Sequence, residues 1–515
     1  MTLEGKSTRR GFLKKAGLVT GGAALSSSIL GSLGASAASA APIAWDQTAD
    51  VVIVGGGGAG LAAAAEAAAA GASVIVLEKA AATGGSTTLS GGVIQAAGTK
   101  YQKQFTKYQN DTPQKHYETW LLEGEGLVDE DLIRDHTAAM PGHITWLEGL
   151  GLEFDAVYGH CHVPYLDKAG VFADRIHVYK GGGAIGGGGP MVAAMETAAT
   201  AAGAKIQLSI EVTSLVTDAA NGVIGVKAKG PNGDFSVGAN KGVVIASSGI
   251  DHNKEMAKAL NAQQYWDITS QSLYTVPTDT GDGIRMGMQI GAALAGFGGT
   301  IDFDPVTGMG TDDRSPQVAF VYVNGRGQRF VCEDATYAYV YRAIFEQTTM
   351  HKASTYMILD SKGVQGPASP WAGSKLAAAV KSGQLVKGTS LLDLARKIKV
   401  PGVNLQATLA NWNRTITRFG KDKEYQRNTQ LVNINKAPYY AYKTVAGNLG
   451  AIGGLKIDVN AQVIDLNGDP IPHLFAAGMA SGGWIGPYYP GSGTAISGVV
   501  HWGRKAGASA ANTVV

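Results

Sequence analysis

A glycine-rich motif near residue 55 could bind the phosphates of a dinucleotide. Gly55, Gly57 and Gly60 form a G-x-G-x-x-G pattern directly after a short β-branched run. The first glycine permits a tight turn, the second lets the backbone approach a pyrophosphate, and the third lets a helix lie close to a strand. A helix that begins here would direct its free N–H groups at the negative charge. The chemistry that this motif predicts is the binding of a phosphate-containing cofactor.

The segments around this motif occur in the order that a dinucleotide-binding fold requires. The pattern predicts a strand over 51–54, a helix over about 61–70 and a second strand over 73–77, which Glu78 closes. Glu78 stands 18 residues after Gly60, where its carboxylate can accept hydrogen bonds from ribose hydroxyls. An acid at this position disfavours the 2′-phosphate of NADP and leaves NAD and FAD open.

Two further regions favour a flavin. Glycines and small hydroxyl residues at 83–87 and 90–92 resemble the segment that flavoproteins place along the pyrophosphate and isoalloxazine. Residues 474–479 are typical of a strand that enters a tight turn, and they resemble the flavoprotein element near the ribityl chain. A helix from about 493–498 through Arg504 could direct its N-terminal N–H groups at the flavin pyrimidine, where negative charge appears on reduction. The predicted cofactor is therefore FAD.

Because both ends of the chain would form one cofactor site, another domain must be inserted between them. From about 291 to 445 the chain gains charge, tyrosine and lysine and loses its glycine–alanine character. We therefore expect an α/β protein with a Rossmann-like FAD-binding domain and an inserted α+β capping (substrate) domain. The expected division is a signal peptide over 1–40, FAD-binding segments over 41–275 and 446–515, and the capping domain over 276–445.

The first forty residues resemble a twin-arginine export signal. Arg9-Arg10 stands in the stretch S-T-R-R-G-F-L-K, a weakly apolar segment follows over about 16–33, and Ala38-Ser39-Ala40 offers a cleavage point. An ordinary secretory signal or membrane anchor is the alternative, but the stretch is too rich in Gly, Ser and Ala for a spanning helix. The resemblance implies export by the twin-arginine machinery to the periplasm or cell envelope.

Composition excludes several classes of protein. In 515 residues, Lys+Arg total 43 and Asp+Glu 41, which provides no basic footprint for nucleic acid. The two cysteines, Cys161 and Cys332, exclude a disulfide framework, a four-cysteine zinc site and an attached c-type haem. His160 and His162 could be a metal fragment, but no further ligand cluster stands nearby, and we expect no metal. Electrons must therefore pass through a separate donor or acceptor, a quinone or cytochrome.

Taken together, residues 48–515 resemble the fumarate reductase/succinate dehydrogenase flavoprotein superfamily, which includes fumarate reductases, urocanate reductase and the 3-ketosteroid Δ1-dehydrogenases. The resemblance is carried by Gly55–Gly60, Glu78, 83–87, 280–283, Gly327-Gln328-Arg329-Phe330, Gly453-Gly454 and 475–497. It implies cofactor contacts at Gly55, Gly57, Gly58, Ala59, Gly60, Glu78, Lys79, Gly84, Gly85, Ser86, Thr87, Gly91, Gly92, Val212, Gly249, Asp282, Gly478, Thr494, Ala495 and Ile496.

Departures from the fumarate reductase pattern point away from a dicarboxylate. Those enzymes place an arginine where Tyr337 stands, a histidine just before the Gly453-Gly454 turn, and a second arginine before Gly493, where this chain has Tyr-Tyr-Pro-Gly over 488–491. A bound dicarboxylate needs cationic partners, because burying a carboxylate without one costs several kcal/mol. Fumarate and succinate are therefore disfavoured as substrates.

The residues that stand at these positions instead match the pattern of another branch of the superfamily. Tyr489-Pro490-Gly491-Ser492-Gly493 is similar to the Tyr-Pro-Gly-x-Gly of ketosteroid dehydrogenases. That resemblance implies that the Tyr489 hydroxyl and the Gly493 N–H bind a substrate ketone, as in an oxyanion hole, and that Tyr337 is the base at the α-carbon. An ordinary tyrosine titrates near about 10, so neighbours must assist. The candidate neighbours are Tyr158, Tyr165, Tyr339 and Tyr341.

Three functions stay open at this point. The leading hypothesis is a flavoenzyme that transfers a hydride and a proton across a C–C bond next to a carbonyl, with a 3-ketosteroid-like small molecule as substrate. The alternative is an exported respiratory ene-reductase that acts on an unsaturated acid or enone. A non-enzymatic electron-transfer flavoprotein would not need the two tyrosines. Two local questions also stay open. The glycines of 181–189 either form a surface loop or pass beside the cofactor, and Asp304, Asp312 and Asp313 either hold a polar substrate or cap turns.

Overall fold

The computed structural model describes residues 43–159, 172–218, 222–307 and 318–514. The expected export signal lies outside the described residues, as do His160, Cys161, His162, Tyr165, Asp312 and Asp313. Contacts divide the chain into Met1–Ala44 and Trp45–Val515, and the fold described below belongs to the second unit. Within the described ranges, no helix has both the length and the apolar character needed to cross a membrane.

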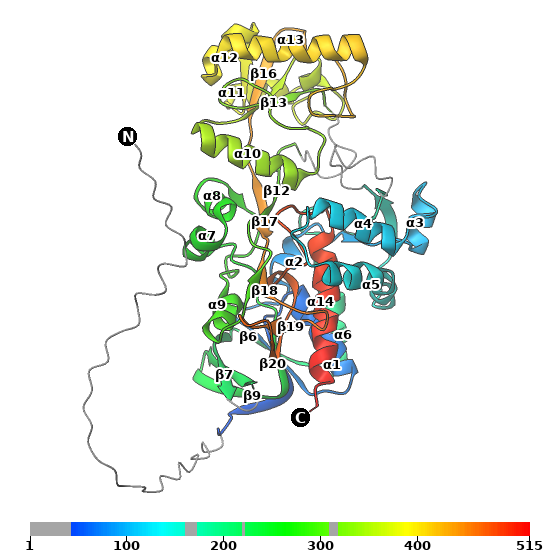
Figure 1. Cartoon of the computed structure of the whole chain (residues 1–515), viewed down its shortest axis with the longest axis vertical. Helices are drawn as coiled ribbons and strands as arrows, with labels where there is room; N and C mark the ends of the chain where they lie inside the picture. The colour runs from blue at the N-terminus through cyan, green and yellow to red at the C-terminus, as the bar shows by residue number, and fades with distance from the viewer. Residues whose placement is uncertain (1–42, 160–171, 219–221, 308–317, 515) are drawn as a thin grey trace, which may run out of the picture. The chain divides into compact units, whose positions relative to one another are not determined.

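The central layer is a mainly parallel sheet formed from both ends of the chain (Figure 1). The strands run side by side as β19 (Gln462–Ile464), β20 (Pro470–Ala476), β9 (Gly233–Ile245), β1 (Gln47–Val54), β2 (Val74–Glu78) and β6 (Lys205–Leu208). β9 separates β1 from β20, pairing in parallel with both, so residues 474–476 lie in the same sheet as 51–54. β7 (Glu211–Asp218) and β8 (Gly222–Gly230) extend from β9 as an antiparallel ribbon.

Small residues allow the helices on this sheet to approach closely. α1 (Gly58–Ala69) packs against α14 (Thr494–Ala511) and α6 (Gly189–Ala201). A Cβ added at Gly507 would lie 2.2 Å from the carbonyl oxygen of Ala63, so only glycine permits this α1–α14 contact. The first and last helices of the unit therefore lie side by side (Figure 1).

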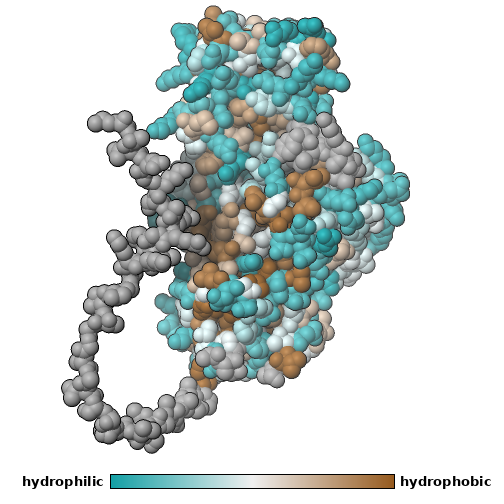
Figure 2. Space-filling view, viewed as in Figure 1, coloured by the Kyte–Doolittle hydropathy of each residue, from teal (hydrophilic) through white to brown (hydrophobic). Residues whose placement is uncertain are grey.

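A second sheet, antiparallel, lies between residues 321 and 443. Its order is β13 (Val321–Val323), β14 (Tyr356–Leu359), β16 (Tyr439–Lys443) and β15 (Leu385–Gly388). Around it are α10 (Tyr337–His351), α11 (Lys375–Lys381), α12 (Leu391–Ile398) and α13 (Gly402–Phe419). Hydrophilic residues cover much of the surface over this part, whereas apolar side chains gather over the middle of the same face (Figure 2). The expected domain boundaries at 275 and 445 stay a prediction.

The unit also contains short elements that form three small sheets and further helices. Three small sheets comprise β3 (Ile94–Gln95), β4 (Phe154–Tyr158) and β5 (Ile176–Tyr179); β10 (Ser272–Leu273), β12 (Thr300–Phe303) and β17 (Gly447–Ala451); and β11 (Leu294–Ala295), β18 (Gly454–Lys456) and β21 (Ser481–Gly482). The remaining α-helices are α2 (Gly85–Leu89), α3 (Lys100–Phe105), α4 (Pro113–Glu123), α5 (Glu130–Gly149), α7 (Lys254–Leu260), α8 (Ala262–Ser270) and α9 (Asp282–Gln289).

Candidate active site

A cavity of about 460 Å³ opens where the parallel sheet meets the connecting elements. Its volume is typical of cofactor and small-molecule sites. Its lining comes from the glycine loop after β1, the segment 85–93, the end of β20, the start of α14, and residues of β12 and α10. One cavity thus contains residues from both chain ends and from the middle of the sequence.

Each glycine of the loop that follows β1 meets a different steric requirement. Gly55 has φ +106°, and a Cβ there would lie 2.5 Å from the carbonyl oxygen of Ala246. Gly60 passes so close to β1 that a Cβ would lie 1.9 Å from the Gly55 carbonyl oxygen. Gly57 is different, because it lines the cavity and the nearest protein atom to its Cβ position is 3.9 Å away. The space at Gly57 is therefore left for a bound group.

The start of α1 lies open to this space. Its N-cap, Gly57, provides no side-chain hydrogen bond, and the Gly58 N–H donates to Thr87 Oγ1 at 3.3 Å. Uncapped N–H groups and the helix dipole favour an anion here. The loop and helix therefore form a cradle of the kind that a pyrophosphate occupies.

Glu78 has a structural task that the sequence did not reveal. Its Oε2 accepts the Gly56 N–H at 2.6 Å, and its Oε1 accepts the Ala80 N–H at 2.7 Å. The carboxylate therefore fixes the glycine loop while it lines the cavity. Each oxygen keeps a second lone pair, which is what a ribose hydroxyl would use.

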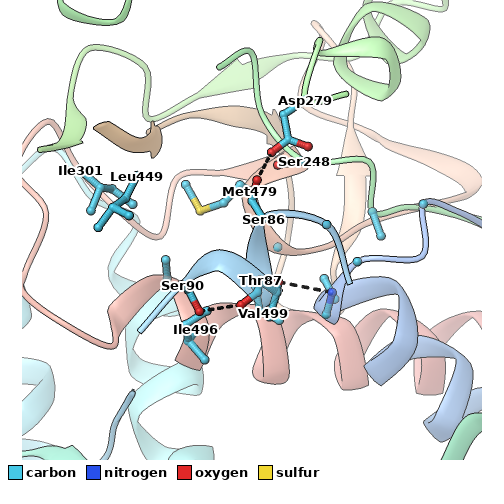
Figure 3. Close-up of a pocket in the computed structure, with 18 of the residues that line it drawn as sticks. Ser86, Thr87, Ser90, Ser248, Asp279, Ile301, Leu449, Met479, Ile496 and Val499 are labelled. Atoms are coloured by element: carbon cyan, nitrogen blue, oxygen red, sulfur yellow. Dashed lines mark hydrogen bonds between the residues drawn. The ribbon is translucent and has the colours of Figure 1, made fainter. Parts of the chain in front are cut away.

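A polar contact joins the segment after β2 to residues 276–282. Lys79 Nζ donates to Asp282 Oδ2 at 2.6 Å and to Thr280 Oγ1 at 2.8 Å. Ser86 Oγ donates to Asp279 Oδ2 at 2.5 Å, and Figure 3 shows Ser86, Ser248 and Asp279 gathered on one side of the cavity. These bonds hold two segments, far apart in sequence, against the same cavity.

Two buried carboxyl groups stand in this region, Asp279 at the cavity and Asp251 behind it. Burial is the largest cause that raises the pKa of Asp251, to about 8, and the nearby Asp279 charge adds to it. Burial also raises the pKa of Asp279 to about 6, against the hydrogen bonds from Ser86 and Ser248. Both groups therefore retain protons that an ordinary aspartic acid releases near about pH 4.

This predicts a pH dependence of stability. In the folded protein the pKa values of Asp251 and Asp279 lie above that of an ordinary aspartic acid. The stability that these protonated carboxyl groups contribute to the folded state is therefore fully present below about pH 4, and it is lost as the pH rises through their folded pKa values. An Asp251→Asn variant keeps an acceptor for the Ala451 N–H, which donates to Asp251 Oδ1 at 2.8 Å. Its melting temperature relative to wild type should rise by about 2–5 °C between pH 5 and pH 8.5. Calorimetry with the exposed Asp469→Asn as control checks this, and an equal pH response in both variants would refute it.

The segment 181–189 is a largely exposed loop that also borders the cavity, so it has features of both alternatives. Gly183, Ala184 and Ile185 line it. The Gly183 N–H donates to the Gly91 carbonyl at 2.8 Å, and a Cβ at Gly188 would lie 1.8 Å from the Thr87 carbonyl oxygen. This segment therefore lies directly on residues 87–92, which themselves line the cavity.

Tyr337, Tyr489 and Gly493 all line the cavity. The rings of Tyr337, the first residue of α10, and Tyr489 lie 5.8 Å apart, and each residue is only 3% exposed. The Tyr489 hydroxyl oxygen accepts the Ala495 N–H at 2.7 Å, at the start of α14. The structure thus brings together the three residues that the sequence predicted as catalytic, although their roles stay predictions.

The proposed assisting tyrosines separate into two kinds. Tyr158 lines the cavity. Tyr341 donates instead to the Val445 carbonyl at 2.8 Å, with its hydroxyl 3.2 Å from Asp304 Oδ2. The Tyr339 ring packs against Tyr488. Asp304 is fully buried and accepts the N–H groups of Val306 and Thr307, so it caps a turn. The geometry therefore favours turn capping by Asp304 over the binding of a polar substrate.

The sequence missed a group of aromatic and aliphatic residues in the cavity lining. Tyr274, Ile301, Phe303, Leu449 and Met479 line the cavity, and Figure 3 shows Ile301 and Leu449 side by side. Among the described lining residues the one Lys or Arg is Lys79, which is already bound to Asp282. An apolar neutral molecule is the kind of ligand that this part of the cavity suits.

Most of the predicted cofactor contacts line the cavity. Those that do are Gly55, Gly57, Gly58, Ala59, Glu78, Lys79, Gly85, Ser86, Thr87, Gly91, Gly92, Val212, Asp282, Gly478, Ala495 and Ile496. Gly60, Gly84, Gly249 and Thr494 stand just behind the lining: Gly84 bridges Gly57, for example, and Thr494 donates its N–H to the Gly491 carbonyl. In the described part of the chain, no group of three or more His, Cys, Asp or Glu side chains could hold a metal ion.

The fold and the cradle define an FAD-binding α/β protein. A family model described as "FAD binding domain" matches residues 50–496, and the chain belongs to this family. It lies within the fumarate reductase/succinate dehydrogenase flavoprotein superfamily, because a probable fumarate reductase of Shewanella frigidimarina is 30% identical and covers 82% of this chain and 68% of that protein. Digoxin reductase of Eggerthella lenta is 30% identical over 459 residues, which cover 82% of this chain and 80% of that protein.

Two solved structures represent two branches of the superfamily. The 3-ketosteroid-Δ4-(5α)-dehydrogenase of Rhodococcus jostii RHA1, in complex with 4-androstene-3,17-dione, is 28% identical with a TM-score of 0.78, covering 92% of this chain and 99% of that one. A flavocytochrome c3 fumarate reductase in its open conformation is 29% identical with a TM-score of 0.67, covering 91% and 78%.

The cofactor is FAD, and the residues present fit it. The space beside Gly57 contains no protein atom nearer than 3.9 Å to a Cβ position, so it is open to the pyrophosphate, and the N-cap of α1 makes no side-chain hydrogen bond there. The Glu78 carboxylate keeps lone pairs that ribose hydroxyls can use. The chain is an FAD-dependent oxidoreductase.

Proposed function

We propose that this enzyme transfers a hydride and a proton across a C–C bond next to a ketone, and that its substrate is an apolar, 3-ketosteroid-like molecule. The observation that carries the proposal is the convergence of Tyr337, Tyr489 and Gly493 on one cavity, whose lining also includes Ile301, Phe303, Leu449 and Met479. The similarity to a 3-ketosteroid dehydrogenase along nearly its whole length supports the same reaction class.

Each residue of this set has a separate task. FAD, when bound, supplies the hydride acceptor or donor. The Tyr489 hydroxyl oxygen accepts the Ala495 N–H, which fixes its position at the start of α14, and in the proposed reaction the hydroxyl donates to the ketone oxygen. The Gly493 N–H supplies the second donor, and together the two stabilise the charge of an enolate. Tyr337 takes or returns the proton at the α-carbon, and the burial of both rings keeps water from competing for that proton.

An exported respiratory ene-reductase is the second candidate. The similarity to a fumarate reductase and the Arg9-Arg10 motif favour it. The absence of an arginine among the described lining residues argues against a dicarboxylate and for an enone or a monoacid. In either case we propose a separate quinone or cytochrome as electron partner. Export to the periplasm or cell envelope by the twin-arginine machinery is proposed as well, and fractionation of cells that carry Arg9→Lys with Arg10→Lys tests it.

The test of function is anaerobic and uses the purified holoenzyme. Addition of a saturated 3-ketosteroid should bleach the absorbance of the oxidised flavin. The control is the same experiment on a Tyr337→Phe, Tyr489→Phe double variant with full FAD content, which should not bleach. If the steroid has no effect and an enone or unsaturated acid reoxidises the chemically reduced enzyme, the ene-reductase replaces the dehydrogenase. Bleaching that survives in the double variant would refute the tyrosine assignment.

A further inference from the structure

Gln95 of β3 contacts the loop 489–493 from outside the cavity lining. The Gln95 amide group donates from Nε2 to the Pro490 carbonyl at 3.3 Å, and its backbone N–H donates to the Gly493 carbonyl at 3.4 Å. Gly493 has φ +92°, and a Cβ there would lie 2.8 Å from the Gln95 nitrogen. Gln95 therefore touches both the residue after Tyr489 and the residue that ends the loop.

The direction of these hydrogen bonds fixes the state of His116 behind Gln95. A carbonyl oxygen only accepts, so the Gln95 nitrogen must face Pro490 and its Oε1 must face the histidine. His116 Nε2 lies 3.0 Å from that oxygen and must carry the proton. Burial, then the nearby Arg175 and His177, lowers the pKa of His116 well below its usual value, which leaves the ring neutral. His116 Nδ1 is consequently a bare acceptor.

A second, small cavity adjoins this pair. It measures about 10 Å³, and its lining includes Gln95, His116, Trp120 and Pro490. His116 Nδ1 and Trp120 Nε1 are buried and have no hydrogen-bond partner among the described residues. One is an acceptor and the other a donor, and the space is about that of one water molecule. A water that donates to the histidine and accepts from the tryptophan would satisfy both atoms.

We infer that Gln95, backed by His116 and one buried water, is the positioning residue for the ketone-binding loop 489–493. The inference rests on the proposed function for the identity of the ligand, but the anchoring of the loop does not depend on it. Gln95 does not itself line the cofactor cavity, although it contacts Gly493, which does. Its effect would pass through the Pro490 and Gly493 carbonyls to the Tyr489 hydroxyl and the Gly493 N–H.

The first measurement is hydrogen–deuterium exchange of holoenzyme variants, read on peptides that cover 489–497. Gln95→Met removes the amide but keeps the length, and loss of a buried hydrogen bond should make exchange about five- to thirty-fold faster there. The matched control is Gln102→Met, since Gln102 is also buried and bonds Asp111, Asp174 and Gly98, none of which is in the loop. Its exchange at 489–497 should stay within about two-fold of wild type.

A second variant and a second measurement distinguish loss of the anchoring contact from misfolding of the variant. Gln95→Glu keeps an acceptor for His116 but removes the donor to Pro490, so it should show the same local acceleration. Binding of a saturated 3-ketosteroid, followed by flavin absorbance, should weaken at least about ten-fold in both Gln95 variants. Unchanged exchange in folded Gln95 variants, or equal acceleration in Gln102→Met, would overturn the inference. Faster exchange with no steroid effect even in wild type would support the anchoring and refute the proposed function.

Discussion

Replacing Tyr337 with phenylalanine should lower the limiting rate of flavin reduction by a saturated 3-ketosteroid by about 10²- to 10⁴-fold, the usual range for loss of a general base. The substitution removes one oxygen and keeps the ring that lies 5.8 Å from Tyr489. FAD content and ketone affinity should therefore change by no more than a few-fold. Anaerobic stopped-flow over a range of steroid concentrations separates the limiting rate from the dissociation constant.

The same helix offers a matched control. Tyr339 stands two residues on in α10, and its ring packs against Tyr488 outside the lining of the main cavity. Tyr339→Phe should leave the limiting rate within about two-fold of wild type. Tyr489→Phe, by contrast, removes an oxyanion donor and should cost about 10²–10³ in rate. If Tyr337→Phe weakened binding but left the limiting rate unchanged, Tyr337 would be a binding residue and the base would have to be sought elsewhere.

The cofactor cradle could be predicted from the sequence because its constraints are local. The positive φ of Gly55 and the contact of Gly60 with the Gly55 carbonyl act within a few residues, and the strand and helix signals around them are strong, although Gly55 also packs against the distant Ala246. The predicted second strand over 73–77 corresponds to β2 within one residue, and the predicted start of the last helix near 493 agrees with α14. Strand and helix ends were less exact: β1 begins at Gln47, before the β-branched run at 51–54.

The apolar half of the cavity could not be predicted in the same way. Tyr274 follows a two-residue strand whose partner is β17, and Phe303 ends a strand that also pairs with β17. Such short strands carry no hydrophobic periodicity, and their pairing joins segments far apart in sequence. Gln95 is a similar case, because nothing in the residues around it indicates a bond to Pro490. Long-range contacts, rather than residue types, decide these positions.

Gly57→Ala should give a folded protein that binds FAD poorly. Gly57 has φ −73° and ψ −179°, a conformation that alanine adopts without strain, and its Cβ position has no protein atom nearer than 3.9 Å. The melting temperature of the apoprotein should therefore stay within about 2 °C of wild type. The added methyl would instead occupy the space beside the helix start, where the pyrophosphate must approach the backbone. Overpacking costs about 1–3 kcal/mol, so the FAD dissociation constant should rise roughly 5- to 150-fold.

Gly60→Ala is the control variant, because it should change the stability of the protein rather than its affinity for FAD. A Cβ at Gly60 would lie 1.9 Å from the Gly55 carbonyl, so α1 would have to move away from β1 whether FAD is present or not. This variant should lose stability by several kcal/mol and express poorly. Measuring both variants by FAD fluorescence titration and by melting of the apoprotein separates the two roles, because only Gly57→Ala should lose affinity without losing stability. If Gly57→Ala bound FAD as tightly as wild type, the cradle would not place the pyrophosphate at this glycine. If it unfolded like Gly60→Ala, the space beside Gly57 would be needed by the protein itself.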